Sequence, residues 1–170
     1  MKNYWDYIEN YWALINYNIH HIQHSELKAS IILTAYGIFF GLAYDVGHEL
    51  LVTDSYKLVF YCLVGIFIIL AITSMVFSFR TFMPRINKKL KKSVFFFNDI
   101  KNHYKSADEY SKELRKTMLD DEKLISLLSE QAYINGVIAA EKYSNISKAI
   151  KFMMYSVFAA LATILFESIL

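Results

Sequence analysis

Positive charge is concentrated in one short stretch in the middle of the chain. Six basic residues lie between positions 80 and 92 with no acidic residue among them, and Phe95, Phe96 and Phe97 follow at once. Guanidinium and ammonium groups bind phosphate oxygens and aromatic rings stack on bases, so the stretch could bind a nucleotide. The alternative is that it only orients the chain in a membrane and attracts anionic lipid. In an oligomer it would repeat around an axis as a phosphate-binding collar of Arg80, Arg85, Lys88, Lys89, Lys91 and Lys92.

Hydroxyl side chains interrupt two long apolar segments, one in the middle of the chain and one at its C-terminal end. Serine and threonine in membrane helices often bond to carbonyl groups of their own helix or hold neighbouring helices together. In an oligomer they could instead line a wetted pore, with a carboxylate at its outer mouth. The sequence leaves both interpretations open. The predicted pore-lining residues are Thr73, Ser74, Ser78, Ser156, Thr163 and Glu167.

His20 and His24 lie one helical turn apart, a spacing that can chelate a metal ion. No cysteine or aspartate nearby in the sequence completes a ligand set, so we interpret both as polar positions of a helix and predict no metal site. The sequence also shows no paired carboxylates, no nucleophile with a histidine partner and no glycine-rich phosphate loop. These observations predict a protein that is not an enzyme and needs no cofactor.

The apolar composition indicates which elements carry these residues. Hydrophobic residues make up 55% of the chain, against about 45–50% in a typical soluble domain. The excess is concentrated in three runs, and the middle run, Leu58–Phe79, has 22 residues without a charge. A bilayer core about 30 Å thick needs about 20 helical residues. This run is therefore predicted to span a membrane.

Two further runs have the length of membrane spans. Ala29–Tyr44 is uncharged, and its apolar pattern continues to Val52. Phe152–Phe166 is uncharged but short, so the C-terminal run spans only if Lys151 reaches one interface and Glu167 the other. The alternative for this run is a helix that lies in the membrane interface. Together the three runs predict three transmembrane helices.

The basic stretch also predicts an orientation, because cytoplasmic loops are enriched in lysine and arginine. The loop between the first two spans holds Asp45, Glu49 and Asp54 against Lys57. We therefore expect the N-terminus and the region after the second span in the cytoplasm, and the C-terminus outside. The predicted parts are an N-terminal cytoplasmic amphipathic helix at 1–28, transmembrane helices at 29–52, 57–80 and 149–170, and a cytoplasmic helical hairpin at 81–148.

The segments outside the membrane also have helical patterns. Apolar residues of the N-terminal segment recur at spacings of three and four, a heptad seam that packs against other helices. No breaker separates this segment from the first span, so the two could form one helix. A second apolar stripe follows the basic stretch in the hairpin. The seam is Trp5, Ile8, Trp12, Ile15, Ile19 and Ile22, and the stripe is Ile86, Leu90, Val94, Phe97, Ile100 and Tyr104.

Helix starts are predicted later in the chain. Ser106 and Glu109 fit a capping box, and Asp120 or Asp121 can cap the helix after it. No proline follows, so one helix of about 50 residues, roughly 75 Å long, could run from the cytoplasm through the membrane, with Gly136 as the expected place for a bend. No segment alternates as a strand does. The predicted fold is an all-α integral membrane protein with three transmembrane helices and no β-sheet.

Four short motifs occur along the chain in a fixed order: Glu26–Ser30, Met83–Ile86, Phe95–Ile100 and Ala140–Tyr143. They resemble motifs of the Pycsar effector family: an acidic-x-Lys-Ala opening of the first span, a Pro-Arg-aliphatic exit from the second, an aromatic segment, and a Lys-Tyr before the third. Their order and spacing cover most of residues 22–170. Glu26 stands where the family more often has aspartate.

The resemblance implies a small membrane effector of bacterial anti-phage defence in the inner membrane. A partner enzyme makes the controlling nucleotide, and the effector disrupts the membrane so that the infected cell stops growing. The family is tied to cyclic pyrimidine mononucleotides, whereas related effectors of Hailong-type systems answer to single-stranded oligonucleotides.

We therefore predict a nucleotide-gated, pore-forming homo-oligomer, similar to a tetramer, that assembles through the heptad seam and the cytoplasmic helices. One alternative is a non-conducting membrane scaffold whose cytoplasmic hairpin recruits a partner. Another is a small-solute transporter, which is disfavoured because no span carries the paired glycines and prolines of a broken helix.

Overall fold

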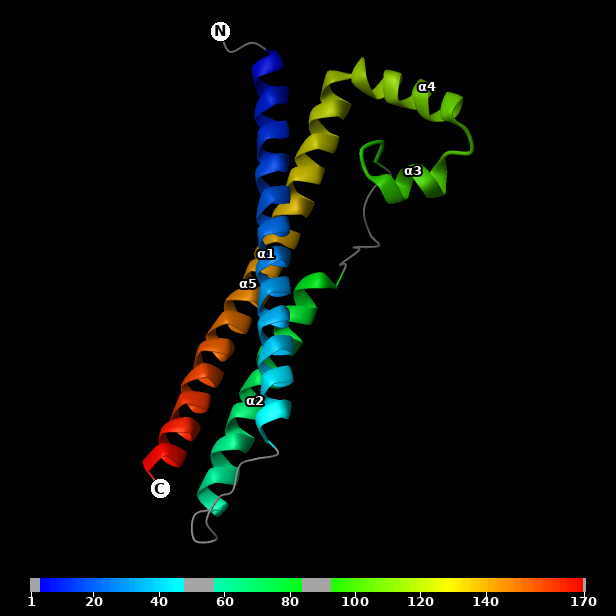
Figure 1. The fold of residues 1–170 in the computed structure, drawn as a ribbon. Helices are drawn as coiled ribbons and strands as arrows, with labels where there is room; N and C mark the ends of the chain where they lie inside the picture. The colour runs from blue at the N-terminus through cyan, green and yellow to red at the C-terminus, as the bar shows by residue number, and fades with distance from the viewer. Residues whose placement is uncertain (1–3, 48–56, 84–92, 170) are drawn as a thin grey trace. The chain divides into compact units, whose positions relative to one another are not determined.

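The computed structural model describes residues 4–47, 57–83 and 93–169. Within these ranges the chain is almost entirely helical and contains no strand. Figure 1 shows two very long helices, α1 and α5, with α2 beside them and the short α3 and α4 joined by a turn. The helices are α1 (Tyr4–Gly47), α2 (Lys57–Phe82), α3 (Phe97–His103), α4 (Ala107–Met118) and α5 (Asp121–Ile169).

Three of these helices contain stretches that are long and apolar enough to cross a membrane: Trp5–Tyr44, Lys57–Phe82 and Asp121–Phe166. The predicted all-α fold with three long apolar helices is thus confirmed. α1 runs through 44 residues as one helix, as the lack of a breaker allowed. α5 runs through 49 residues and passes Gly136 without an interruption.

The chain divides into two compact units. Unit 1 consists of Met1–Ile22 and Pro84–Ala140, and unit 2 consists of Gln23–Met83 and Glu141–Leu170. α3 and α4 belong to unit 1, and α2 belongs to unit 2. α1 and α5 each contribute one part to unit 1 and the other part to unit 2.

Large apolar side chains form the core of unit 1. Ile15 of α1 packs with Leu124 and Leu128 of α5, and Leu128 is fully buried. Ile8 packs against the same cluster, so two positions of the heptad seam contact the chain's own α5. Trp5, at the start of the seam, is 69% exposed. Part of the surface that was predicted to join subunits is therefore used within one chain.

Both helix starts predicted in this unit have side-chain caps. Ser106 Oγ accepts a hydrogen bond from the Glu109 amide at 3.2 Å, and Glu109 Oε2 accepts from the Lys105 amide at 3.0 Å. Asp120 Oδ1 accepts from the Lys123 amide at 3.0 Å and so caps α5. Each bond satisfies an amide that the first turn of a helix leaves without a backbone partner.

The predicted apolar stripe of the hairpin is not one helix. Its members Ile86 and Leu90 lie outside the described residues, and Ser93–Phe96 forms a turn before α3 begins. Asp99 Oδ2 accepts a hydrogen bond from the Ser93 amide at 2.9 Å. Such a bond satisfies a backbone group outside a helix and competes with helix formation. The periodic apolar pattern could not reveal this bond.

Alanines take three of the six buried positions in the core of unit 2. Ala29 of α1, Ala71 of α2 and Ala149 of α5 are fully buried in one cluster, together with Tyr36 and other apolar residues. Between membrane helices there is no hydrophobic driving force, since lipid tails are as apolar as leucine. Close packing of small residues and hydrogen bonds between helices then hold the helices together. The core of unit 2 has the composition that this environment favours.

Candidate functional site

Two serines of the spans bond to a neighbouring helix. Ser74 of α2 donates to the Ala149 carbonyl of α5 at 2.8 Å. Ser156 of α5 and the Tyr36 hydroxyl of α1 share a hydrogen bond of 2.8 Å. Ser74, Ser156 and Ser78 are all fully buried, and Ser78 Oγ has no hydrogen-bond partner among the described residues. These side chains lie between helices of one chain.

The other predicted pore-lining residues have different surroundings. Thr73 donates to the Ile69 carbonyl at 2.8 Å, and Thr163 donates to the Ala159 carbonyl at 2.9 Å. Both threonines are half-buried and bond to their own helix. The side chain of Glu167 lies outside the described part. The pore-lining role of this set stays a prediction.

A lysine ammonium joins the three helices of unit 2. Lys142 of α5 donates to Glu26 Oε1 of α1 at 2.7 Å and to the Thr81 carbonyl oxygen of α2. Lys142 is only 8% exposed, whereas the Glu26 side chain is 38% exposed. A charge with so little access to water needs a counter-charge and hydrogen bonds, and Lys142 has both. We call these three residues the Lys142 clamp.

The carbonyl group in this clamp lies at the C-terminal end of α2. Thr81 is the second-last residue of the helix, so its carbonyl is one of the four that lack an amide partner within the helix. Lysine side chains can hydrogen-bond such carbonyls, which carry the negative end of the helix dipole. The Thr81 hydroxyl is also buried and donates to the Phe77 carbonyl at 3.1 Å. Lys142 thus satisfies the end of α2 from a different helix.

The clamp residues lie close in sequence to every point at which the chain changes unit. Glu26 follows the boundary after Ile22, Thr81 precedes the boundary after Met83, and Lys142 is the second residue after Ala140. Each of the three segments therefore passes through the clamp as it enters or leaves unit 2. The same ammonium group therefore contacts two of these segments and belongs to the third.

The predicted phosphate-binding collar falls mostly on residues that the structure does not describe. Arg80 is exposed in the last turn of α2, with its guanidinium 5.6 Å from the centroid of the Phe77 ring. Phe95 packs against the core of unit 1, and Phe96 lines a pocket, so the two rings have separate surroundings. The members outside the described residues are Arg85, Lys88, Lys89, Lys91 and Lys92.

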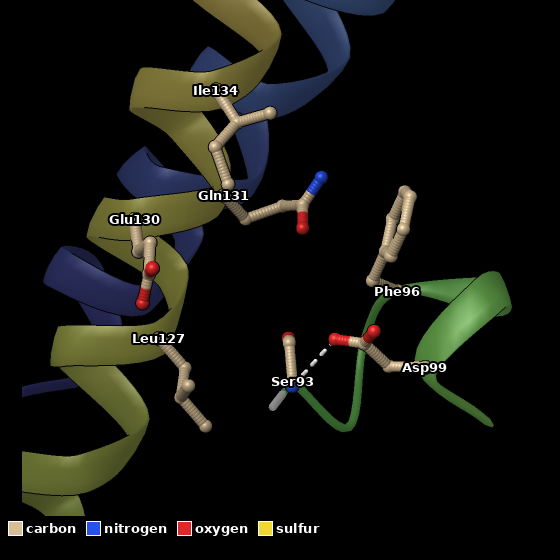
Figure 2. Close-up of a pocket in the computed structure, with 7 residues that line it drawn as sticks. All are labelled: Ser93, Phe96, Asp99, Leu127, Glu130, Gln131 and Ile134. Atoms are coloured by element: carbon tan, nitrogen blue, oxygen red, sulfur yellow. Dashed lines mark hydrogen bonds between the residues drawn. The ribbon is translucent and has the colours of Figure 1, made fainter. Parts of the chain in front are cut away.

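A small pocket in unit 1 lies directly after the basic stretch in sequence. Ser93, Phe96 and Asp99 line one side, and residues of α5 line the other (Figure 2). Figure 2 shows the amide of Gln131 directed into the gap between the two sides. Its Nε2 donates to Asn135 Oδ1 at 3.1 Å. The lining residues on α5 are Leu127, Glu130, Gln131 and Ile134.

The size and charge of this pocket argue against a nucleotide in it. Its enclosed volume of about 20 Å³ suits one water molecule and is too small for a nucleobase. Asp99 and Glu130 both contribute carboxylates, which would repel a phosphate group. The pocket therefore does not replace the collar as the predicted nucleotide site.

The histidines of the N-terminal segment lie on the exposed surface of α1. His20 and His24 are both exposed, and the ring of His21 meets the Tyr17 ring edge-on at 4.5 Å. Across the described ranges, no three histidine, cysteine, aspartate or glutamate side chains come together in a way that could hold a metal ion.

Three long apolar helices, a core of small hydrogen-bonded residues between them and a second helical unit define a helical membrane protein. Residues 10–167 match PycTM, the Pycsar effector protein domain. The chain belongs to the Pycsar effector family and is a cyclic-nucleotide-activated membrane effector of anti-phage defence. Comparison with curated proteins and with solved structures gave no significant match.

The clamp joins residues of two motifs that lie far apart in the sequence. Glu26 opens the acidic-x-Lys-Ala motif, Lys142 belongs to the Lys-Tyr motif, and Thr81 lies just before the Pro-Arg motif. The contact itself was missed, because 116 residues separate Glu26 from Lys142. One signal was present: Lys142, Ile146 and Ala149 are spaced to lie on one helix face, and all three are buried. A lysine on such a face requires a partner.

Proposed function

We propose that this effector is a homo-oligomer, similar to a tetramer, that opens an ion-conducting path through the bacterial inner membrane. The observation that carries the proposal is the family match over residues 10–167, which includes most of the first apolar helix and all of the other two. A partner cyclase makes the controlling ligand, a cyclic pyrimidine mononucleotide in the first instance or a short single-stranded oligonucleotide. The N-terminus lies in the cytoplasm and the C-terminus lies outside.

A water path requires more than one copy of the chain. A cavity of about 240 Å³ among α1, α2 and α5 is lined by apolar side chains, apart from Tyr36 and Ser156, which bond to each other. This cavity therefore offers no continuous polar path through the described part of one chain. In the oligomer, Thr73 and Thr163 are the first candidates to face water, because both are only half-buried.

The ligand binds on the cytoplasmic side, where its enzyme makes it. Residues 80–92 concentrate positive charge without acidic residues to cancel it, and symmetry would multiply this charge around an axis. Phosphate groups neutralised by such a collar release counterions, so binding weakens as salt rises. The slope of this dependence is shallow for one cyclic mononucleotide and steep for an oligonucleotide, which distinguishes the two ligand classes.

The Lys142 clamp is the proposed link between ligand and spans. Thr81 lies within the stretch 80–92 that holds the collar, directly after Arg80, and its carbonyl accepts a hydrogen bond from Lys142. A ligand that pulls on the end of α2 changes this bond and thereby the attachment of α2 to α1 and α5. Lys142 then acts as a positioning residue, not as a ligand contact.

Reconstitution in liposomes tests the proposal. Cyclic CMP or a short single-stranded oligonucleotide is added on the side that carries the N-terminus, and ion flux is recorded at several salt concentrations. Flux should change with one of the two ligands, and Arg85→Gln, Lys88→Gln and Lys89→Gln should weaken the response. Lys112→Gln, an exposed position on α4, is the control and should respond as the unchanged protein does.

The scaffold alternative has one observation in its favour. Ser74, Ser78 and Ser156 are buried between helices of one chain, as expected for residues that hold helices together. A protein that inserts and assembles normally, yet shows no flux with either ligand, would support a non-conducting scaffold. Unchanged ligand binding in all three collar variants would show that the basic stretch only sets the orientation of the chain in the membrane and does not bind the ligand.

A further inference from the structure

Two cations share one aromatic ring at the end of α2. The Arg80 guanidinium lies 5.6 Å and the Lys148 ammonium 5.5 Å from the centroid of the Phe77 ring. Both distances are within the range of attractive cation–π contacts. Phe77 stacks on Phe152 of α5 at 5.8 Å with an angle of 7° between the rings. The packing of α2 on α5 therefore fixes the ring, and one cation from each of the two helices lies against it.

Neither of these charges is neutralised. Arg80 and Lys148 are both exposed, and neither takes part in an ion pair within the described residues. α2 contains no acidic residue, and α5 contains none between Glu141 and Glu167. The clamp already uses Glu26, the acidic residue of α1 in this part of unit 2. Two exposed cations that contact one ring, and that have no carboxylate partner among the described residues, are available to bind an anion from outside the chain.

The position of the pair along α2 indicates where that anion comes from. Arg80 is the first charged residue after the uncharged run Leu58–Phe79. That run has the length of the bilayer hydrocarbon core, so Arg80 lies at the level of the lipid headgroups. Lys148 contacts the same ring and lies at the same level. The anion most concentrated at this depth is the phosphodiester of an anionic phospholipid.

We propose that Arg80, Lys148 and Phe77 form a binding site for the phosphate of an anionic phospholipid, placed between α2 and α5. The guanidinium fork of Arg80 donates to two phosphate oxygens, and Lys148 supplies a second positive charge from the other helix. Bound lipid then ties α2 to α5. The Phe77 carbonyl accepts the Thr81 hydroxyl, so the site lies one helical turn from the Lys142 clamp. This inference does not depend on nucleotide control or on conduction.

Native mass spectrometry of the full-length protein tests the site. The protein is reconstituted in nanodiscs that contain phosphatidylglycerol and phosphatidylcholine, and the retained phosphatidylglycerol is counted. Arg80→Gln and Lys148→Gln should each lower retention about fivefold, since one charge near the surface contributes about 1 kcal/mol. Phe77→Leu keeps an apolar side chain but removes the ring face, and should lower retention about two- to fivefold.

A matched control variant and a second measurement, of cyclic CMP binding, distinguish a lipid phosphate from a nucleotide phosphate at this site. Lys116→Gln, an exposed lysine of α4, should retain lipid as the unchanged protein does. Cyclic CMP binding by Lys148→Gln and Phe77→Leu is measured in discs of phosphatidylcholine alone; Arg80→Gln is left out of this arm because Arg80 belongs to the predicted nucleotide collar. Reduced lipid retention with unchanged cyclic CMP binding supports the lipid site. Unchanged lipid retention in both charge variants overturns it, and reduced cyclic CMP binding with unchanged lipid retention assigns the phosphate to the nucleotide.

Discussion

The cores of the two units are built from side chains of different size. In unit 1 the fully buried member of the core cluster is Leu128, with Leu124 and Ile15 around it. In unit 2 three of the four fully buried positions of the main cluster are alanines, Ala29, Ala71 and Ala149, and the fourth is Ile146. Ser74 lies beside them and donates to the Ala149 carbonyl. Both units consist of long helices, so secondary structure does not explain the difference.

The predicted surroundings account for this difference, since we expect unit 1 to lie in water and unit 2 in lipid. In water, burying a leucine removes apolar surface from the solvent, and this stabilises the folded unit. In lipid that gain is absent, and close approach and hydrogen bonds take its place. Unit 1 should therefore be sensitive to the loss of volume. Unit 2 should be sensitive to added volume and to the loss of single hydrogen bonds between its helices.

The largest effect is expected in unit 1. Leu128→Ala should lower the free energy of unfolding by about 3 kcal/mol, because it leaves a cavity in a fully buried site. This change in the free energy of unfolding is measured by urea unfolding of the protein in detergent, with amide hydrogen exchange in unit 1 as the signal. Leu119→Ala at a 78% exposed position is the control and should change little. Equal effects of the two variants would contradict an apolar core here.

Lys142→Met should have the next largest effect. It leaves Glu26 and the Thr81 carbonyl without the ammonium group, at a cost of about 2–3 kcal/mol, less than for a fully buried pair because Glu26 is partly exposed. Thermal unfolding and ligand-dependent flux are both recorded. Lys151→Met, an exposed lysine of the same helix, is the control.

A charge exchange sharpens this test. Lys142→Glu combined with Glu26→Lys restores an ion pair between α1 and α5 but leaves no ammonium group on α5 for the Thr81 carbonyl. Stability should recover in part, while the coupling of ligand to flux should stay impaired. Full recovery of flux would show that the bond to α2 has no role in control.

In unit 2 we expect a smaller loss of stability when side-chain volume is added, whereas unit 1 is expected to lose stability when volume is removed. Ala71→Leu adds volume at a fully buried contact and should destabilise the helix packing by about 2 kcal/mol, through strain. The neighbouring Ile72→Leu changes an exposed side chain and serves as the control. Thermal unfolding in mild detergent compares them. If Ala71→Leu were stabilising, the small-residue core would not be closely packed.

The smallest effect concerns a single bond. Tyr36→Phe removes the hydroxyl that meets Ser156 and should cost about 0.6 kcal/mol, a typical value between membrane helices. A double-mutant cycle with Ser156→Ala isolates the pair, and Tyr155→Phe at an exposed position is the control. A coupling energy near zero together with reduced ion flux would favour the pore-lining role of Ser156 instead.

Local signals predicted most of the fold. The uncharged run Leu58–Phe79, the Ser106 cap and the Asp120 cap depend on neighbours in sequence, and the structure contains a helix or a cap at each. The Lys142 clamp depends on three distant segments, and no periodicity encodes which residues meet. The turn at Ser93–Phe96 was not predicted either. The apolar pattern continues through it and does not show that the Ser93 amide donates to Asp99.

The clamp also bears on how the protein is made. The ribosome completes Glu26 and Thr81 well before Lys142, since the chain is synthesised from its N-terminus. A nascent chain with only two spans holds a carboxylate without its ammonium partner and a helix end without its donor. The three-helix arrangement of unit 2 can close only after the third span has entered the membrane. Translation that stops before Lys142 should therefore leave an unassembled hairpin, open to membrane proteases.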